Sequence, residues 1–120
     1  MRYEHAFYMT RDRQLDVEFL LLDLGTRGWR AYILSDIDYT SVSASRSRSI
    51  LDTHRLSEKS TERRIDPDKS YYYVCWNQTV RDLETMKRIC AAWSEITAYY
   101  IQHGGSFPAI QKKLTEQGVI

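Results

Sequence analysis

The sequence predicts a single α+β domain over residues 1–120, with an antiparallel β-sheet in the first two-thirds and one long and one short C-terminal α-helix. Three patterns support this fold class. Residues 3–9 have the period-two alternation of a strand with one buried face. Residues 17–34 hold two β-rich runs around a glycine turn, and from Leu83 onward apolar residues recur every three or four positions, as on an amphipathic helix. A chain of 120 residues suits one domain with one core.

The first predicted strand places alternate side chains on opposite faces. One face carries Tyr3, His5, Phe7 and Met9, and the other carries Arg2, Glu4, Ala6 and Tyr8. We expect the first set, with His5 among it, to form the buried face because it is the more apolar of the two.

The next two strands form a predicted hairpin. Residues 17–24 are almost continuously apolar, and residues 29–34 resume the strand pattern. Between them stands Gly25-Thr26-Arg27-Gly28, whose glycines permit the positive φ angles that a tight turn needs.

A polar excursion separates this hairpin from the last strand. Residues 36–68 are rich in Ser, Arg, Thr and Glu, and only Val42 and the Ile50-Leu51 pair offer apolar anchors. The composition predicts one irregular strand or a disordered segment. Residues 71–76, Tyr-Tyr-Tyr-Val-Cys-Trp, then read as a strand with large side chains on both faces, which is typical of an interior position in a sheet.

The long helix is expected to start close to Asn77, either capped by it or by a capping box from Thr79 to Asp82. At about 23 residues it would span roughly 35 Å, whereas a six-residue strand spans roughly 20 Å. Its apolar end, residues 93–100, therefore needs cover from the short helix or from another subunit. On this ground we expect a homo-oligomer, most simply a dimer.

Glycines and capping residues delimit both helices. His103-Gly104 supplies a stop for the long helix. Ser106 is a predicted cap for the short helix, with Pro108 in its first turn and Gly118 at its end.

Composition narrows the function classes. A formal net charge of +1 gives no support for nucleic-acid binding. No apolar run reaches the roughly 18 residues of a membrane span, and the polar start does not resemble a signal peptide. Cys75 and Cys90 fit a reducing compartment, so we expect a cytoplasmic protein without a membrane partner.

No catalytic or metal-binding motif stands out. The two cysteines and the histidines at 5, 54 and 103 do not have zinc-ligand spacing, and we expect core thiols and structural histidines. We therefore expect no cofactor, no metal and no enzymatic activity. The alternative is a small nuclease or nucleotide hydrolase in which Asp36 and Asp38, on one strand face, hold Mg²⁺.

Arginines and aromatic residues are the candidate ligand-binding groups, because guanidinium groups pair with phosphates and stack on rings. They occur at the hairpin turn, in the Arg-Ser stretch 45–49 and around the expected helix N-terminus, where free N–H groups favour anions. The candidate residues are Arg27, Arg30, Arg46, Arg48, Trp76, Asn77, Arg81 and Arg88. Each also has an ordinary reading as a solvated turn, a solvated loop, or a cap with a Glu84–Arg88 pair.

The order of elements in this chain resembles that of the phage anti-Thoeris proteins. The features that carry the resemblance are the tyrosine-rich strand 71–76 and the grouping of Arg27, Arg30, Trp76, Asn77 and Arg81. The resemblance covers the whole chain at the level of layout. Members of that family are non-enzymatic, oligomeric sponges that sequester cyclic ADP-ribose-type signals with arginines and aromatic residues. The resemblance implies a phage protein that acts in the bacterial cytoplasm, where it binds a signalling nucleotide (cyclic ADP-ribose type or cyclic oligonucleotide) and blocks host immune signalling.

The aromatic content leaves a second function open. Nine tyrosines and three tryptophans also suit a protein-interaction module, such as a phage inhibitor of a host defence enzyme. A nucleotide sponge binds its ligand alone, whereas such an inhibitor needs a protein partner.

Overall fold

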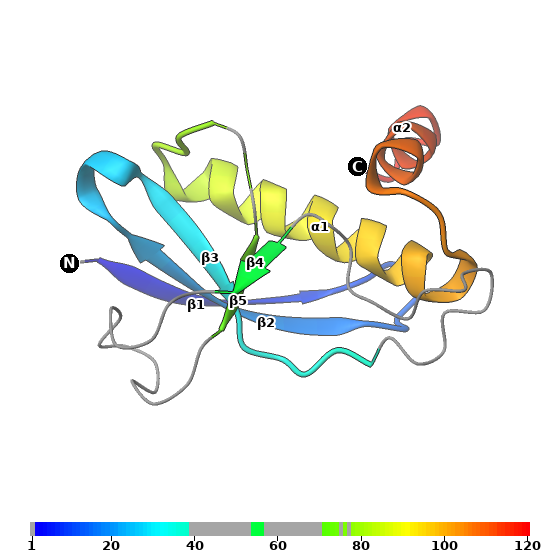
Figure 1. Cartoon of the computed structure of the whole chain (residues 1–120), viewed down its shortest axis with the longest axis horizontal. Helices are drawn as coiled ribbons and strands as arrows, with labels where there is room; N and C mark the ends of the chain where they lie inside the picture. The colour runs from blue at the N-terminus through cyan, green and yellow to red at the C-terminus, as the bar shows by residue number, and fades with distance from the viewer. Residues whose placement is uncertain (1, 39–53, 57–70, 75, 77) are drawn as a thin grey trace.

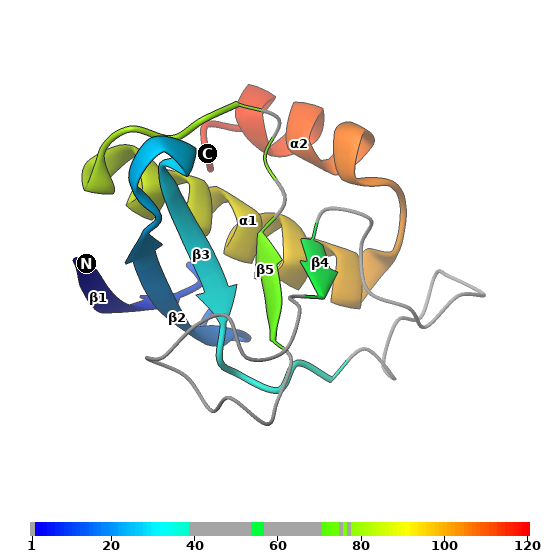
Figure 2. The same ribbon diagram turned by 60° about the vertical axis from the view of Figure 1, so that its left-hand side comes forward.

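A five-stranded antiparallel sheet with two helices after it forms the protein, which confirms the predicted α+β class (Figures 1 and 2). This computed structural model describes residues 2–38, 54–56, 71–74, 76 and 78–120. The strand order is β1-β2-β3-β5-β4. The elements are β1 (Tyr3–Met9), β2 (Asp16–Asp23), a 3₁₀ turn (Gly25–Arg27), β3 (Trp29–Ile33), β4 (His54–Leu56), β5 (Tyr72–Val74), α1 (Leu83–His103) and α2 (Phe107–Glu116).

The predicted hairpin is confirmed. β2 and β3 pair antiparallel, with Asp23 opposite Trp29 next to the turn. β5 lies between β3 and β4, so its predicted interior position is also confirmed. The expectations for the polar excursion, including Arg46 and Arg48, fall on residues 39–53 and 57–70, outside the described part of the chain; within the excursion, β4 is described.

Helix α1 crosses one face of the sheet and packs on β1, β2 and β3 (Figure 1). Trp93 is 2% exposed and meets the Phe19 ring edge-on, with 5.9 Å between ring centroids. The core on this face gathers the inward side chains of the strands and the apolar stripe of the helix, namely Val17, Phe19, Leu21, Trp29, Ala31, Ile33, Val74, Val80, Met86, Ile89, Cys90 and Trp93. Burial raises the pKa of the Cys90 thiol to about 12, which confirms a core thiol there; Cys75 lies outside the described residues.

The predicted start of the long helix is wrong. α1 begins at Leu83, and its N-cap is Asp82, whose carboxylate accepts the Thr85 N–H at 3.0 Å. Tertiary contact explains the late start, because Val80 is buried and its carbonyl accepts the Trp29 N–H at 2.8 Å. Asp82 is therefore the first residue able to cap the helix, and the capping box at Thr79 does not form.

The short helix covers the apolar end of the long one. Ile96 and Tyr100 of α1 pack against Ile110 and Leu114 of α2. Ser106 caps α2 as predicted, accepting the N–H of Ala109 at 3.4 Å. The apolar end of α1 therefore needs no second subunit to cover it. The homo-oligomer stays a prediction, but this argument no longer supports it.

The two faces of β1 are the reverse of the prediction. Tyr3, His5, Phe7 and Met9 are exposed, whereas Glu4, Ala6 and Tyr8 are half-buried under α1. The physical reason is that Ala6 and Tyr8 pack against the core beneath α1 and that three polar contacts join the first strand region to this helix. These join Glu4 to Lys87, Tyr8 to Glu95 at 2.7 Å and Asp12 to Gln102 at 2.6 Å.

Replacing Trp93 by alanine should lower the free energy of unfolding by about 3–5 kcal/mol, because a fully buried indole is lost and a cavity is left. Chemical denaturation followed by fluorescence measures it. Lys112→Ala, at an exposed site on α2, is the control and should change stability by less than about 0.5 kcal/mol. A loss below about 1 kcal/mol for Trp93→Ala would mean that this helix does not pack on the sheet as described.

Candidate functional site

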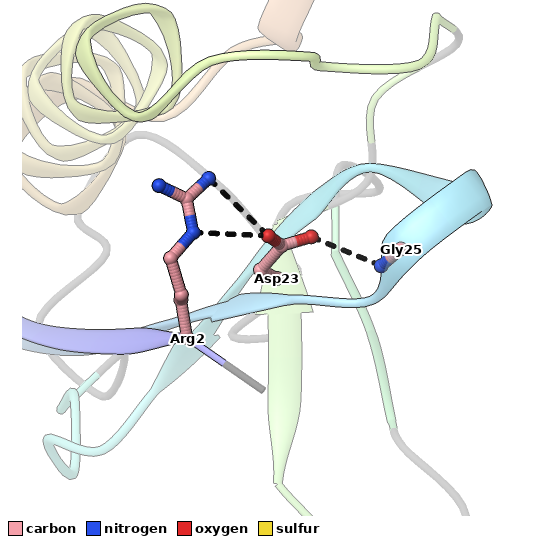
Figure 3. A network of polar contacts seen from close by, with 3 residues as sticks. All are labelled: Arg2, Asp23 and Gly25. Carbon is pink, nitrogen blue, oxygen red and sulfur yellow. Dashed lines mark hydrogen bonds and ion pairs between the residues drawn. The ribbon is translucent and has the colours of Figure 1, made fainter.

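The turn between β2 and β3 is fixed by one carboxylate. Asp23 accepts the Gly25 N–H at 2.9 Å through Oδ1, and its Oδ2 lies 3.4 Å from Nε and Nη2 of Arg2 (Figure 3). The Arg2 guanidinium also lies 5.4 Å from the centre of the Trp29 ring. The start of the first strand is thereby joined to the hairpin turn, as the β1–β2 register requires.

The segment before α1 packs on the same turn. The Arg81 Nη1 donates to the Thr26 carbonyl at 3.3 Å. At Gly28, φ is +76° and an added Cβ would stand 2.5 Å from the Val80 carbonyl oxygen. This close approach is open only to glycine, and it brings Arg81 to the turn that carries Arg27.

Four arginines share this end of the molecule, which we call the arginine end: Arg2, Arg27, Arg81 and Arg88. Arg88 Nη2 donates to the Thr85 hydroxyl at 3.2 Å, beside the Asp82 cap. Hydrogen bonds from Thr85, aided by the charge of Arg88, lower the pKa of Asp82. Within the part of the chain that the structure describes, no hydrogen bond or ion pair holds the exposed Arg27 side chain.

This arrangement can bind an anion. Guanidinium groups match phosphate and carboxylate geometry, and Asp23 and Asp82 offset only part of the four positive charges. Arg2 is the member that the sequence interpretation missed. The antiparallel pairing of the first two strands could have identified it, because this pairing places the start of β1 beside the end of β2.

Arg30 is directed to the other face of the sheet. Its guanidinium lies 4.2 Å from the centre of the Tyr73 ring, and Nη1 donates to the Tyr32 hydroxyl at 3.3 Å. Its neighbour Trp29 belongs to the core beneath α1. Because adjacent strand residues face opposite sides, the structure separates Arg30 from Arg27 and Arg81.

Trp76 lies over the middle of α1 rather than at its N-terminus. It lines a small apolar cavity with Ile89, Trp93 and Phe107. The cavity volume is about 20 Å³, room for about one water molecule, so a nucleotide base does not fit inside it. The N-terminus of α1 is itself occupied by the Asp82 carboxylate, and Asn77 lies outside the described residues.

The remaining candidate chemistry is sparse. Among the described residues, no group of three or more His, Cys, Asp or Glu side chains could hold a metal ion. His5 is exposed on β1 rather than buried, and His103 lies against the Tyr99 ring at 4.5 Å between centroids. In the same described part of the chain, no helix is long and apolar enough to cross a membrane.

Comparisons with protein-family models, with curated proteins and with solved structures give no match for this chain.

Gly28→Ala should cost roughly 2–6 kcal/mol, because positive-φ strain and overpacking against Val80 each cost about 1–3 kcal/mol. Gly25→Ala is the matched control. Its φ is +67°, but nothing lies within 4 Å of an added Cβ, so only about 1–2 kcal/mol of backbone strain is expected. Urea unfolding of both variants measures the difference. Equal losses would show that the segment before α1 does not pack on the turn.

Proposed function

We propose that this protein binds a small phosphorylated ligand at the arginine end without transforming it. The observation that supports this most is the bond from Arg81 to the Thr26 carbonyl. This bond brings Arg81 to the tight turn that carries Arg27, although the two arginines are far apart in sequence. Arg27 and Arg81 are exposed there and can reach one phosphate.

The position of Trp76 constrains the ligand. Ile89 and Trp93, which flank it, lie roughly 9–15 Å along the helix from Leu83 at 1.5 Å per residue. If the phosphate of a mononucleotide contacts Arg27 and Arg81, its base is therefore too close to that phosphate to stack on Trp76. A ligand with a base and a phosphate well separated, such as a dinucleotide-like signal, fits both contacts better.

The resemblance to the anti-Thoeris family supports a narrower form of the proposal. In that form, the protein is a phage sponge in the bacterial cytoplasm that sequesters a cyclic ADP-ribose-type or cyclic oligonucleotide signal and so blocks host immune signalling. Sequestration requires affinity and no bond-making, which suits a site built from arginines.

A protein-interaction module is the second candidate, for example a phage inhibitor of a host defence enzyme. Exposed aromatic side chains favour it, because Tyr72 and Trp76 are each 42% exposed on the outside of the fold and such residues are enriched in interfaces. This candidate takes the place of the first if the purified protein binds no nucleotide.

Arg27→Ala and Arg81→Ala should each weaken nucleotide binding roughly ten- to a hundredfold, because a charged hydrogen bond contributes about 1.5–3 kcal/mol. Isothermal calorimetry with cyclic ADP-ribose, ADP-ribose and cyclic dinucleotides measures this, and the melting temperature should stay nearly constant. Affinity should also fall as salt rises.

Two controls sharpen the measurement. Lys112→Ala removes one positive charge at a distant, exposed site on α2 and should leave affinity unchanged. Arg30→Ala should also have little effect, because Arg30 faces the tyrosines across the sheet. The proposal fails if no nucleotide gives heat, or if Arg30→Ala weakens binding while Arg27→Ala and Arg81→Ala do not.

A further inference from the structure

Exposed apolar side chains are concentrated on β1. Of the five large hydrophobic residues that are exposed in the described chain, three stand on this strand. Tyr3, Phe7 and Met9 are 46%, 69% and 49% exposed. They alternate along one face of a seven-residue strand, together with His5. The three side chains therefore form one apolar stripe along the strand.

The same odd-numbered residues direct their backbone groups away from the sheet. At one end of β1, the Arg2 carbonyl accepts the Asp23 N–H, and at the other, the Thr10 N–H donates to the Leu15 carbonyl. Even-numbered residues therefore bond to β2. Because antiparallel ladders alternate between bonded and non-bonded pairs, the N–H and C=O groups of His5 and Phe7 point outward.

β1 is an edge of the described sheet, and the inward-pointing charge of Glu4 is the one edge-protecting feature on this strand. The strand order places it at one end, its register with β2 is continuous, and it contains no proline. Glu4 is turned inward and paired with Lys87. Proteins usually blunt a long edge with charges, proline or a bulge, because an open edge pairs with another strand.

We propose that two copies of this protein pair antiparallel through β1, so that their sheets become continuous. A two-fold axis at Ala6 places His5 opposite Phe7 of the second copy and Tyr3 opposite its Met9. Every apolar residue of the stripe thereby meets another residue of the stripe. On the inner face Glu4 lies opposite Tyr8, so no like charges are opposed. This self-complementarity is what identifies a second copy as the occupant.

The helices leave room for this arrangement. α1 packs on β1, β2 and β3, so its axis lies near β2. Two such helices on a continuous sheet stand about three strand spacings apart, or roughly 14 Å. Packed helices need only about 8–10 Å, and the two copies of α1 therefore do not collide.

The exposed area of the stripe shows that the interface is small. With aromatic side chains of roughly 150–250 Å² each, Tyr3 and Phe7 leave on the order of 200 Å² of apolar surface per copy. Even with the backbone and Met9 added, the interface stays below the roughly 1,200 Å² of a standard one. An interface of this size is typical of weak association, so we expect a reversible dimer.

Sedimentation velocity from about 1 µM to about 500 µM measures the dimer, and β1 variants test the interface. His5→Pro removes an outward N–H and spares the bonds to β2, so the fold should persist and the dimer should be lost. Phe7→Ser should weaken the dimer roughly ten- to a hundredfold. Trp76→Ala removes an exposed aromatic residue elsewhere and should leave dimerisation unchanged.

Amide exchange by NMR tests the mode of pairing independently of any variant. The amides of His5 and Phe7 should gain protection as concentration rises, whereas the amide of Ala6, which faces β2, should be protected throughout. A protein that stays monomeric over this range overturns the proposal. So does a dimer in which the amides of His5 and Phe7 exchange freely, because it would use another surface.

Discussion

Polar contacts between the first strand region and α1, together with the packing of Ala6 and Tyr8 on the core, hold the first strand against the helix. Glu4, Tyr8 and Asp12 are spaced by four residues, and their partners Lys87, Glu95 and Gln102 follow in the same order along the helix. Four strand residues span roughly 13 Å, and the seven or eight helical residues between successive partners span roughly 10–12 Å. The first strand region and α1 therefore run parallel, and their contact residues recur at matching intervals.

The middle contact is the most buried of the three. Glu95 is buried, and its Oε2 accepts both the Tyr8 hydroxyl at 2.7 Å and the Arg11 N–H at 3.1 Å. Burial first, and then the neighbouring carboxylate, raises the pKa of Tyr8 to about 12. The phenol therefore remains a donor at neutral pH. Because its folded-state pKa exceeds its ordinary value of 10.0, Tyr8 supports folding fully below about pH 10 and loses that effect as pH rises toward about 12.

The sequence predicted the fold class, the hairpin, the interior strand and the amphipathic stripe of the long helix, because each rests on local periodicity or turn chemistry. It assigned the wrong face of β1, since Tyr3, Phe7 and Met9 are the more apolar set. The partners that draw Glu4 and Tyr8 inward lie some 80 residues later, at Lys87 and Glu95. A polar contact between distant segments leaves no mark in a local pattern.

The sequence predicts part of the candidate site correctly and misplaces the rest. Arg27 and Arg81 do meet at one turn, but the reason is the packing of Val80 beneath Gly28, which no motif announces. Arg30 was separated from them by strand alternation, and Arg2 joined them through the β1–β2 register. The sequence predicts Trp76 at the N-terminus of the long helix, but that helix begins seven residues later, at Leu83.

A double-mutant cycle on Tyr8→Phe and Glu95→Met tests most directly the claim that this polar contact orients β1. Urea unfolding at neutral pH gives the free energy of unfolding of the two single variants and the double variant. The structure predicts a coupling energy of about 1–3 kcal/mol, because either single variant already removes the part-buried, charge-assisted hydrogen bond and the second substitution cannot remove it again. Additive effects, within about 0.5 kcal/mol, would contradict the claim and with it the assignment of the outward face.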